Sequence, residues 1–208
     1  LERFFEDRES ITVEEFMEVT RKAVIDIKIV PVLAGAAFKN KGIQRLLDAV
    51  VALLPSPLEV GDVTGENPFI KKEEDRKPDP NEPFSALVFK IATDPFVGRL
   101  AYLRVYSGVL KAGDQVLNSR TNRKERINRI YQMHANKQNP KDRIEAGDIC
   151  GAVGFKDIRT GDTMCDPKKP IAFETMVFPD PVLSIAVEPK TKDDIEKLGL
   201  ALNKLAEE

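Results

Sequence analysis

From Phe84 onwards the sequence alternates short apolar segments with glycine-containing turns, and this pattern constrains the fold more than any other feature. Residues 84–91 and 99–106 are apolar and strand-like. Turn dipeptides recur between the later segments: Ser107-Gly108, Gly113-Asp114, Gly147-Asp148 and Gly161-Asp162. Several short strands at this spacing predict a small β-barrel.

The regions on either side of the predicted barrel mix helices and single strands. A capping box at residues 12–15 opens a predicted helix, and an apolar stripe over 43–54 predicts a second one. Between them, the β-branched run Ile29–Leu33 is expected to be a buried strand, because strand, turn and helix in this order are typical of α/β folds. After the barrel, residues 182–187 predict a strand and residues 193–207 a helix, the opening of an α+β domain.

Composition adds a linker and excludes several classes of protein. Residues 58–82 are rich in charges and prolines and poor in apolar residues, as linkers are. The formal charge of −2 excludes a protein that binds nucleic acid through a large net positive charge. Two cysteines argue against a disulfide scaffold and fit a protein of a reducing compartment. A single histidine makes a Cys/His zinc cage hard to build, and no apolar run approaches the ~18 residues of a membrane span.

One segment is strongly basic although the chain as a whole is slightly acidic. Between residues 120 and 143, eight bases stand against two acids, a local charge of +6. Concentrated positive charge suits an RNA backbone, because each neutralised phosphate releases counterions; a merely solvated strand face is the alternative. On one continuous strand, Lys124 and Arg126 would share one side, whereas Glu125, Ile127 and Arg129 would share the other.

Longer stretches resemble bacterial elongation factor G, a family of translational GTPases. These stretches are residues 35–57, 94–100, 106–108, 132–136, 146–148, 161–163, 178–181 and 187–190. The resemblance covers essentially the whole chain and implies a central segment with a mainly β fold. Residues 1–57 would end the α/β GTPase domain, 58–79 would be a linker, 80–177 the β-barrel domain II, and 178–208 the start of a ferredoxin-like domain III. The absence of an initial methionine and of a stop after the last helix also led us to expect an excised piece.

The resemblance also implies a function. The family moves tRNA and mRNA through the ribosome at the expense of GTP, so this segment would be a ribosome-docking and domain-coupling module. The implied cofactors of the parent protein are GTP and Mg, and the implied partner is small-subunit rRNA, with tRNA and mRNA contacted indirectly. We further expect a cytoplasmic monomer that makes no membrane contact.

Two groups of site residues follow from the resemblance. Backbone amides of a guanine loop would come from Gly35, Ala36, Ala37 and Phe38, where the family usually has serine at the position of Ala36. The RNA-contact candidates are Arg99, Arg120, Arg123, Lys124, Arg126, Arg129, His134 and Lys137. His134 has no nearby serine, cysteine or paired carboxylate to activate, so a structural or RNA-facing role is favoured over catalysis.

The segment itself lacks the motifs of GTP hydrolysis. It contains no G-x-x-x-x-G-K-[ST] loop, and Asn40-Lys41-Gly42 continues with Ile43 rather than with the guanine-reading aspartate. The D-x-x-G at 62–65 lies in the predicted linker and is interpreted as chance. We therefore expect no catalytic residue, no metal site and no cofactor for this segment alone.

Three alternative functions remain open from the sequence. The first is a paralogous translational GTPase of the ribosomal protection type. The second is a freestanding RNA-binding β-barrel, and the third is a nucleotide-binding enzyme of different chemistry. The absence of a phosphate-binding loop opposes the third.

Overall fold

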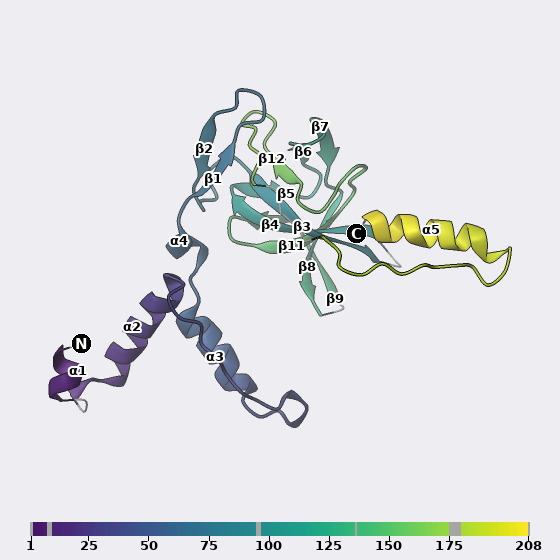
Figure 1. The fold of residues 1–208 in the computed structure, drawn as a ribbon. Coiled ribbons are helices and arrows are strands. Elements are labelled where there is room, and N and C mark those ends of the chain that lie inside the picture. Colours follow the sequence, from purple (N-terminus) through teal and green to yellow (C-terminus); the bar gives the residue numbers. More distant parts are fainter. Residues whose placement is uncertain (1, 8–9, 95–96, 136, 175–179, 208) are drawn as a thin grey trace. The chain divides into compact units, whose positions relative to one another are not determined.

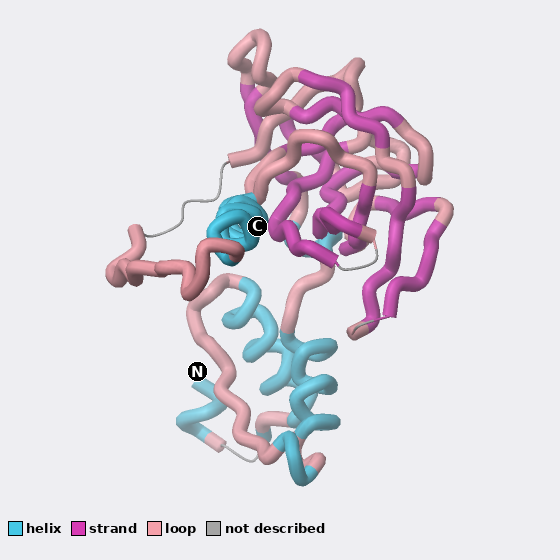
Figure 2. The backbone as a smooth tube through the Cα atoms, turned by 90° about the vertical axis from the view of Figure 1, so that its right-hand side faces the viewer, coloured by secondary structure: helices cyan, strands magenta, loops and turns pink. Residues whose placement is uncertain are grey.

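The computed structural model describes residues 2–7, 10–94, 97–135, 137–174 and 180–207. The chain divides into two compact units, residues 1–60 (unit 1) and residues 61–208 (unit 2). Figures 1 and 2 show helices in unit 1 and most of the strands gathered in one body of unit 2. Among the helices described, none is long and apolar enough to cross a membrane.

Unit 1 consists of short helices joined by extended segments. Its elements are α1 (Glu2–Glu6), α2 (Val13–Ile25), the 3-10 helix η2 (Ala37–Lys39), α3 (Ile43–Leu53) and α4 (Pro57–Val60). The predicted capping box is confirmed: Thr12 Oγ1 accepts from the Glu15 amide, and the Glu15 carboxylate accepts from the Thr12 amide. Arg21 of α2 donates to the Ala52 carbonyl at 2.6 Å and to Glu59 at 2.7 Å, which ties α2 to α3 and α4.

The strand expected at Ile29–Leu33 is wrong. These residues pair with no strand in the described part of the chain and are exposed, Val32 by 92%. A β-branched run becomes a buried strand only when a neighbouring strand satisfies its backbone and a covering layer buries its side chains. The described part of unit 1 offers neither.

Unit 2 is built around an eight-stranded antiparallel sheet of order β7-β6-β12-β3-β4-β11-β8-β9. Strand β5, which follows β4 along the chain, pairs with β10, which follows β9, in a separate antiparallel two-stranded sheet. The bounds are β3 Ser85–Asp94, β4 Gly98–Ser107, β5 Val109–Lys111, β6 Gln115–Asn118, β7 Arg123–Arg126, β8 Arg129–His134, β9 Lys137–Lys141, β10 Arg143–Glu145, β11 Ile149–Val153 and β12 Thr163–Cys165. Apolar side chains from both sheets form one core, which includes Val88, Leu103, Leu110 and Ile130. The strands predicted at 84–91 and 99–106 are confirmed as β3 and β4.

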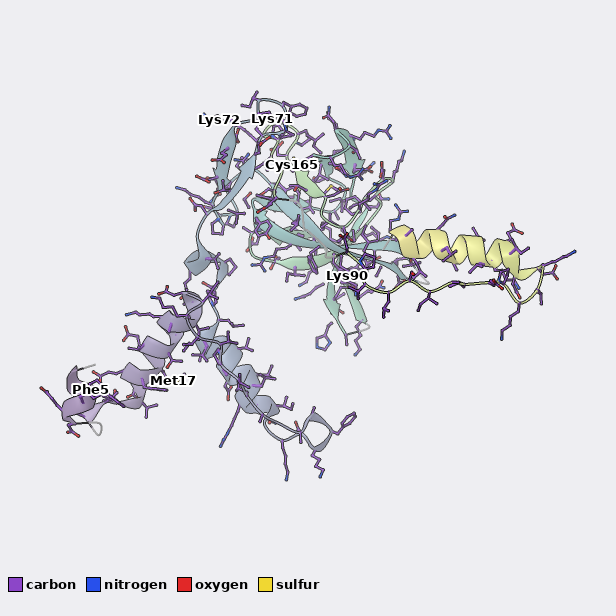
Figure 3. The ribbon with its side chains drawn as sticks, viewed as in Figure 1. Phe5, Met17, Lys71, Lys72, Lys90 and Cys165 are labelled. Carbon is purple, nitrogen blue, oxygen red and sulfur yellow. The ribbon has the colours of Figure 1, made fainter. Side chains whose placement is uncertain are left out.

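Part of the segment that composition marked as a linker is ordered. Strands β1 (Val63–Glu66) and β2 (Glu73–Arg76) form an antiparallel hairpin with Lys71 and Lys72 near its end (Figure 3). Gly65 lies so close to Ile171 that a Cβ would meet its side chain at 2.7 Å, and Glu66 exchanges two backbone hydrogen bonds with Ala172. The hairpin is therefore joined to the segment that follows β12 in unit 2 rather than being a free tether.

The continuous basic strand expected through residues 124–129 is broken in two. Strand β7 pairs with β6, whereas β8 pairs with β11 and β9. Glu125 and Ile127 are both buried, so they share one side as predicted, but Arg129 is exposed and Ile130 takes the buried position. The face assigned to Arg129 was therefore wrong, because the chain changes neighbours between the two strands and the alternation restarts.

The C-terminal part confirms the helix and corrects the strand. Helix α5 runs over Asp194–Glu207. Residues 182–187 form no strand, and their apolar side chains are exposed. As at Ile29–Leu33, no partner strand lies beside them in the described part of the chain. Pro95, Phe96, Asn136 and residues 178–179, which belong to segments that carried the resemblance, lie outside the described residues.

Candidate functional site

The predicted guanine loop is a closed turn. The Ala36 amide donates to the Lys41 carbonyl at 2.9 Å, and the Lys41 amide returns a bond to the Ala36 carbonyl at 3.1 Å. The Lys39 amide donates to the Ala36 carbonyl, and the Asn40 amide donates to the Ala37 carbonyl. Ala36 therefore uses its amide within the loop, which leaves the amides at the start of η2 as the donors that a ligand could meet.

Glycines at both ends let this loop close. A Cβ on Gly35 would lie 2.9 Å from the Lys41 carbonyl oxygen, and one on Gly42 would lie 3.0 Å from the Ala34 carbonyl oxygen. Gly42 also has φ +80°, a conformation that side chains disfavour. The two glycines thus allow backbone-to-backbone contact immediately before α3 begins. The side chain of Phe38, in contrast, is fully exposed.

The basic side chains of β7 point outwards, and the acid between them points inwards. Arg123, Lys124 and Arg126 are exposed, whereas Glu125 is 4% exposed. The Glu125 carboxylate accepts from the Lys156 amide at 3.0 Å and from the Asp157 amide at 3.3 Å. Burying a carboxylate is costly unless it is hydrogen-bonded, and these two donors supply the compensation.

Arg120 is separate from the other cations because it is already paired. Its guanidinium donates to Asp162 at 2.6 and 3.0 Å and to Asp157 at 3.2 Å. Asp162, 3% exposed, also accepts from the Asn118 side chain and from the Arg159 amide. Hydrogen bonding to Asp162 raises the pKa of Arg120 above its ordinary value. This arginine therefore fastens the turn around Gly161 to β6.

The remaining candidates lie at two other places in unit 2. Arg129 begins β8, and His134 faces Lys137 in register at the end of the β8–β9 hairpin; all three are exposed. Arg99, half-buried in β4, donates to the Lys156 carbonyl at 3.4 Å. Gln138 of β9 donates to Asp94 at 2.7 Å, which links that hairpin to the end of β3.

The structure thus joins some predicted residues and separates others. It sets Arg123, Lys124 and Arg126 on one strand, with Arg129 following the break. Sequence reasoning missed the buried acids Glu125 and Asp162, which organise this region. The Gly161-Asp162 turn was visible in the sequence, but nothing there indicated a pairing with Arg120. Among the described residues, no group of three or more His, Cys, Asp or Glu side chains is placed to hold a metal ion.

Two parts of unit 2 match family models of translation elongation factors. Residues 98–165 match the family model described as elongation factor Tu domain 2. Residues 178–208 match the model described as elongation factor G, domain III. The predicted fold class, mainly β with a translation-factor barrel, is confirmed.

Within that class, the chain is similar over its whole length to elongation factor G. It is 62% identical over 208 residues to elongation factor G of Amoebophilus asiaticus (strain 5a2), covering all of this chain and 29% of the relative. It is 58% identical over 208 residues to elongation factor G of Cytophaga hutchinsonii, covering 100% of this chain and 30% of the relative. It is 57% identical over 206 residues to elongation factor G of Karelsulcia muelleri (strain GWSS), covering 99% of this chain and 30% of the relative. The family resemblance inferred from the sequence is therefore confirmed, and the matched domains are those of translational GTPases.

The chain is also similar to a solved structure. A crystal structure of a protein from Thermus thermophilus superposes with a TM-score of 0.69 at 28% identity, covering 99% of this chain and 28% of the other. The chain spans less than a third of the length of the relatives it matches.

Proposed function

We propose that this chain is the central part of a GTP-dependent ribosomal translocase of the elongation factor G type. The observation that carries the proposal is the 62% identity over the whole chain to a protein of that name. In this proposal, residues 1–57 end the GTPase domain, 58–79 connect it to the barrel of 80–177, and 178–208 begin domain III. The parent protein acts as a monomer in the cytoplasm.

Unit 2 is proposed to dock on small-subunit rRNA. Support comes from the sorting of charge on β7, where three bases face solvent and Glu125 is buried. A phosphate backbone near this strand meets cations and no exposed acid of the strand itself. Arg129, His134, Lys137 and Arg99 remain candidates for further RNA contacts. Arg120 is the candidate least suited to bind phosphate, because Asp157 and Asp162 already occupy its guanidinium.

In the parent protein, the loop Gly35–Phe38 is proposed to contact the guanine of GTP. The amides of Ala37 and Phe38, at the start of η2, suit a carbonyl acceptor. Ala36 stands where the family usually has serine, so this chain lacks the serine hydroxyl but keeps the backbone amide. These two donors, the amides of Ala37 and Phe38, support the proposed contact with the base of the nucleotide. The motifs that would hold the phosphates and magnesium are not among these 208 residues. We expect this chain alone not to hydrolyse GTP, while in the parent protein unit 2 relays nucleotide-dependent changes that move tRNA and mRNA.

The experiment is co-sedimentation of the chain with purified small ribosomal subunits over a salt series. The test variant carries Arg123→Ala, Lys124→Ala and Arg126→Ala. The matched control removes three exposed lysines elsewhere in unit 2, Lys77, Lys90 and Lys168. Losing three phosphate contacts is expected to make the slope of log K against log salt shallower by about 2 to 3, and the control is expected to change it far less.

Two results would contradict the docking proposal. One is an absence of binding at low salt. The other is equal binding by the test and control variants, which would mean that β7 is only a solvated strand face.

A further inference from the structure

We infer that the loop after β11, residues 154–159, is a second wall of the proposed RNA-binding surface, and that buried Glu125 holds it there. In this arrangement Lys156 and Arg159 contact phosphates together with the cations of β7. Glu125 is a positioning residue, which acts through the loop and touches no RNA. The inference rests on the proposed docking of unit 2 on RNA and adds residues that the sequence did not single out.

The first link between β7 and the loop is the Glu125 carboxylate. Its two oxygens accept from consecutive amides, those of Lys156 at 3.0 Å and Asp157 at 3.3 Å. A side chain that accepts from two successive amides fixes the direction of the backbone there. The side chains that start from this backbone, including Lys156, are consequently set relative to β7.

The second link lies one step earlier along the loop, at Gly154. The Asn128 amide donates to the Val153 carbonyl at 2.9 Å. Gly154 follows at φ +119°, and a Cβ there would lie 2.7 Å from the Arg126 carbonyl oxygen and 2.8 Å from the Asn128 nitrogen. The loop therefore leaves β11 in direct backbone contact with the junction between β7 and β8, and only glycine allows the approach.

The acid of the loop and the acid that follows it are paired with Arg120, whereas the bases of the loop are exposed. Asp162 is buried, and Asp157 is half-buried and paired with Arg120. The Arg159 amide donates to Asp162 at 2.9 Å, which fixes the backbone at the far end of the loop while the side chains of Arg159 and Lys156 stay exposed. Six exposed cations thus come from two connected segments: Arg123, Lys124, Arg126, Arg129, Lys156 and Arg159. In the proposed arrangement, these cations together meet the evenly spaced phosphates of an RNA backbone.

The first test removes the two cations of the loop. The variant Lys156→Ala with Arg159→Ala is compared with Lys77→Ala with Lys168→Ala in the same co-sedimentation and salt series. Losing two phosphate contacts is expected to make the slope of log K against log salt shallower by about 1.5, with the control close to the unmodified chain. A slope equal to that of the control overturns the inference.

The second test uses Glu125→Gln. The lost negative charge and the lost positioning of the loop have opposite expected effects on the affinity for RNA. Glutamine removes a negative charge, so electrostatics alone predicts tighter binding to RNA. It also keeps only one acceptor oxygen for two amides, so loss of position predicts binding weakened about threefold or more, with a shallower salt slope. Asp142→Asn, an exposed acid of the same basic segment, makes the same change of charge without touching the loop and is expected to tighten binding slightly.

Two further measurements distinguish loss of the loop's position from unfolding of the barrel. Tyrosine fluorescence melting of each variant identifies loss of the barrel, and Glu125→Asp, which retains two acceptor oxygens on a shorter arm, is expected to recover part of the binding. If the β7 triple variant weakens binding but the loop variants do not, only the inference is wrong. If neither does, the docking proposal fails as well.

Discussion

Asp162 is the buried acid on which the turn after β11 depends, and its removal is expected to destabilise the barrel strongly. Its carboxylate accepts from the side chain of Asn118 at 2.8 Å, from that of Arg120 at 2.6 Å and from the Arg159 amide at 2.9 Å. In Asp162→Ala the amide of Asn118, a fully buried residue, keeps only a 3.3 Å contact with the Asp157 carbonyl.

The magnitude follows from what each donor loses. An unsatisfied buried donor costs about 1–3 kcal/mol, which applies to Asn118 and, at the lower end, to the Arg159 amide. The Arg120 side chain is 38% exposed and keeps Asp157, so its loss is that of a surface ion pair, about 0–1 kcal/mol. The free energy of unfolding is therefore expected to fall by about 3 kcal/mol, lowering Tm by about 6–12 °C for a unit of this size.

Tyrosine fluorescence is the assay suited to this prediction. The chain has no tryptophan, and all three of its tyrosines, Tyr102, Tyr106 and Tyr131, lie in unit 2. Urea unfolding followed by this signal therefore reports on the barrel and not on unit 1. Asp142→Ala, which removes an exposed acid, is the control and is expected to change stability by less than about 0.5 kcal/mol. A loss below about 1 kcal/mol for Asp162→Ala would refute the reasoning that this network is buried and cooperative.

Three other predictions concern unit 1 and the cysteines. Hydrogen bonding from Arg21 holds the pKa of Glu59 at about 2, below its ordinary 4.5, so this pair stabilises unit 1 above pH 4.5 and stops doing so as the pH falls through 2. Far-UV circular dichroism should show Glu59→Gln to be less stable at neutral pH and less sensitive to acid over that range; identical pH profiles would contradict this. Burial raises the pKa of Cys150 to about 12 and that of Cys165 above its usual value, so about one Cys150 thiol in 10⁴ is ionised at pH 8. Mass spectrometry should find neither cysteine alkylated by iodoacetamide until urea is added, and labelling of the native chain would show that the barrel opens. Thr12→Ala should destabilise α2 by about 1 kcal/mol, seen as faster amide exchange, whereas Thr12→Ser should not.

The sequence by itself determined the elements whose stabilising contacts are local. The capping box at Thr12, the helix that begins after Gly42 and the terminal helix α5 follow from spacing within a few residues. The strands β3 and β4 follow from long apolar runs bounded by turns. The guanine-loop and RNA candidates came from the family resemblance and from the density of basic residues, and their roles stay predictions.

Only the tertiary structure decided which strands form and which charges are free. Ile29–Leu33 has a strand-like composition but no strand beside it in the described part of unit 1, while the hairpin β1–β2 forms from a charged, linker-like sequence because it joins the segment that follows β12 through Ala172. Likewise, Arg120 is paired and Glu125 is buried because of groups about 30 to 40 residues away along the chain. A strand needs a neighbour for its backbone, and a buried charge needs donors around it, so both depend on contacts that local patterns do not encode.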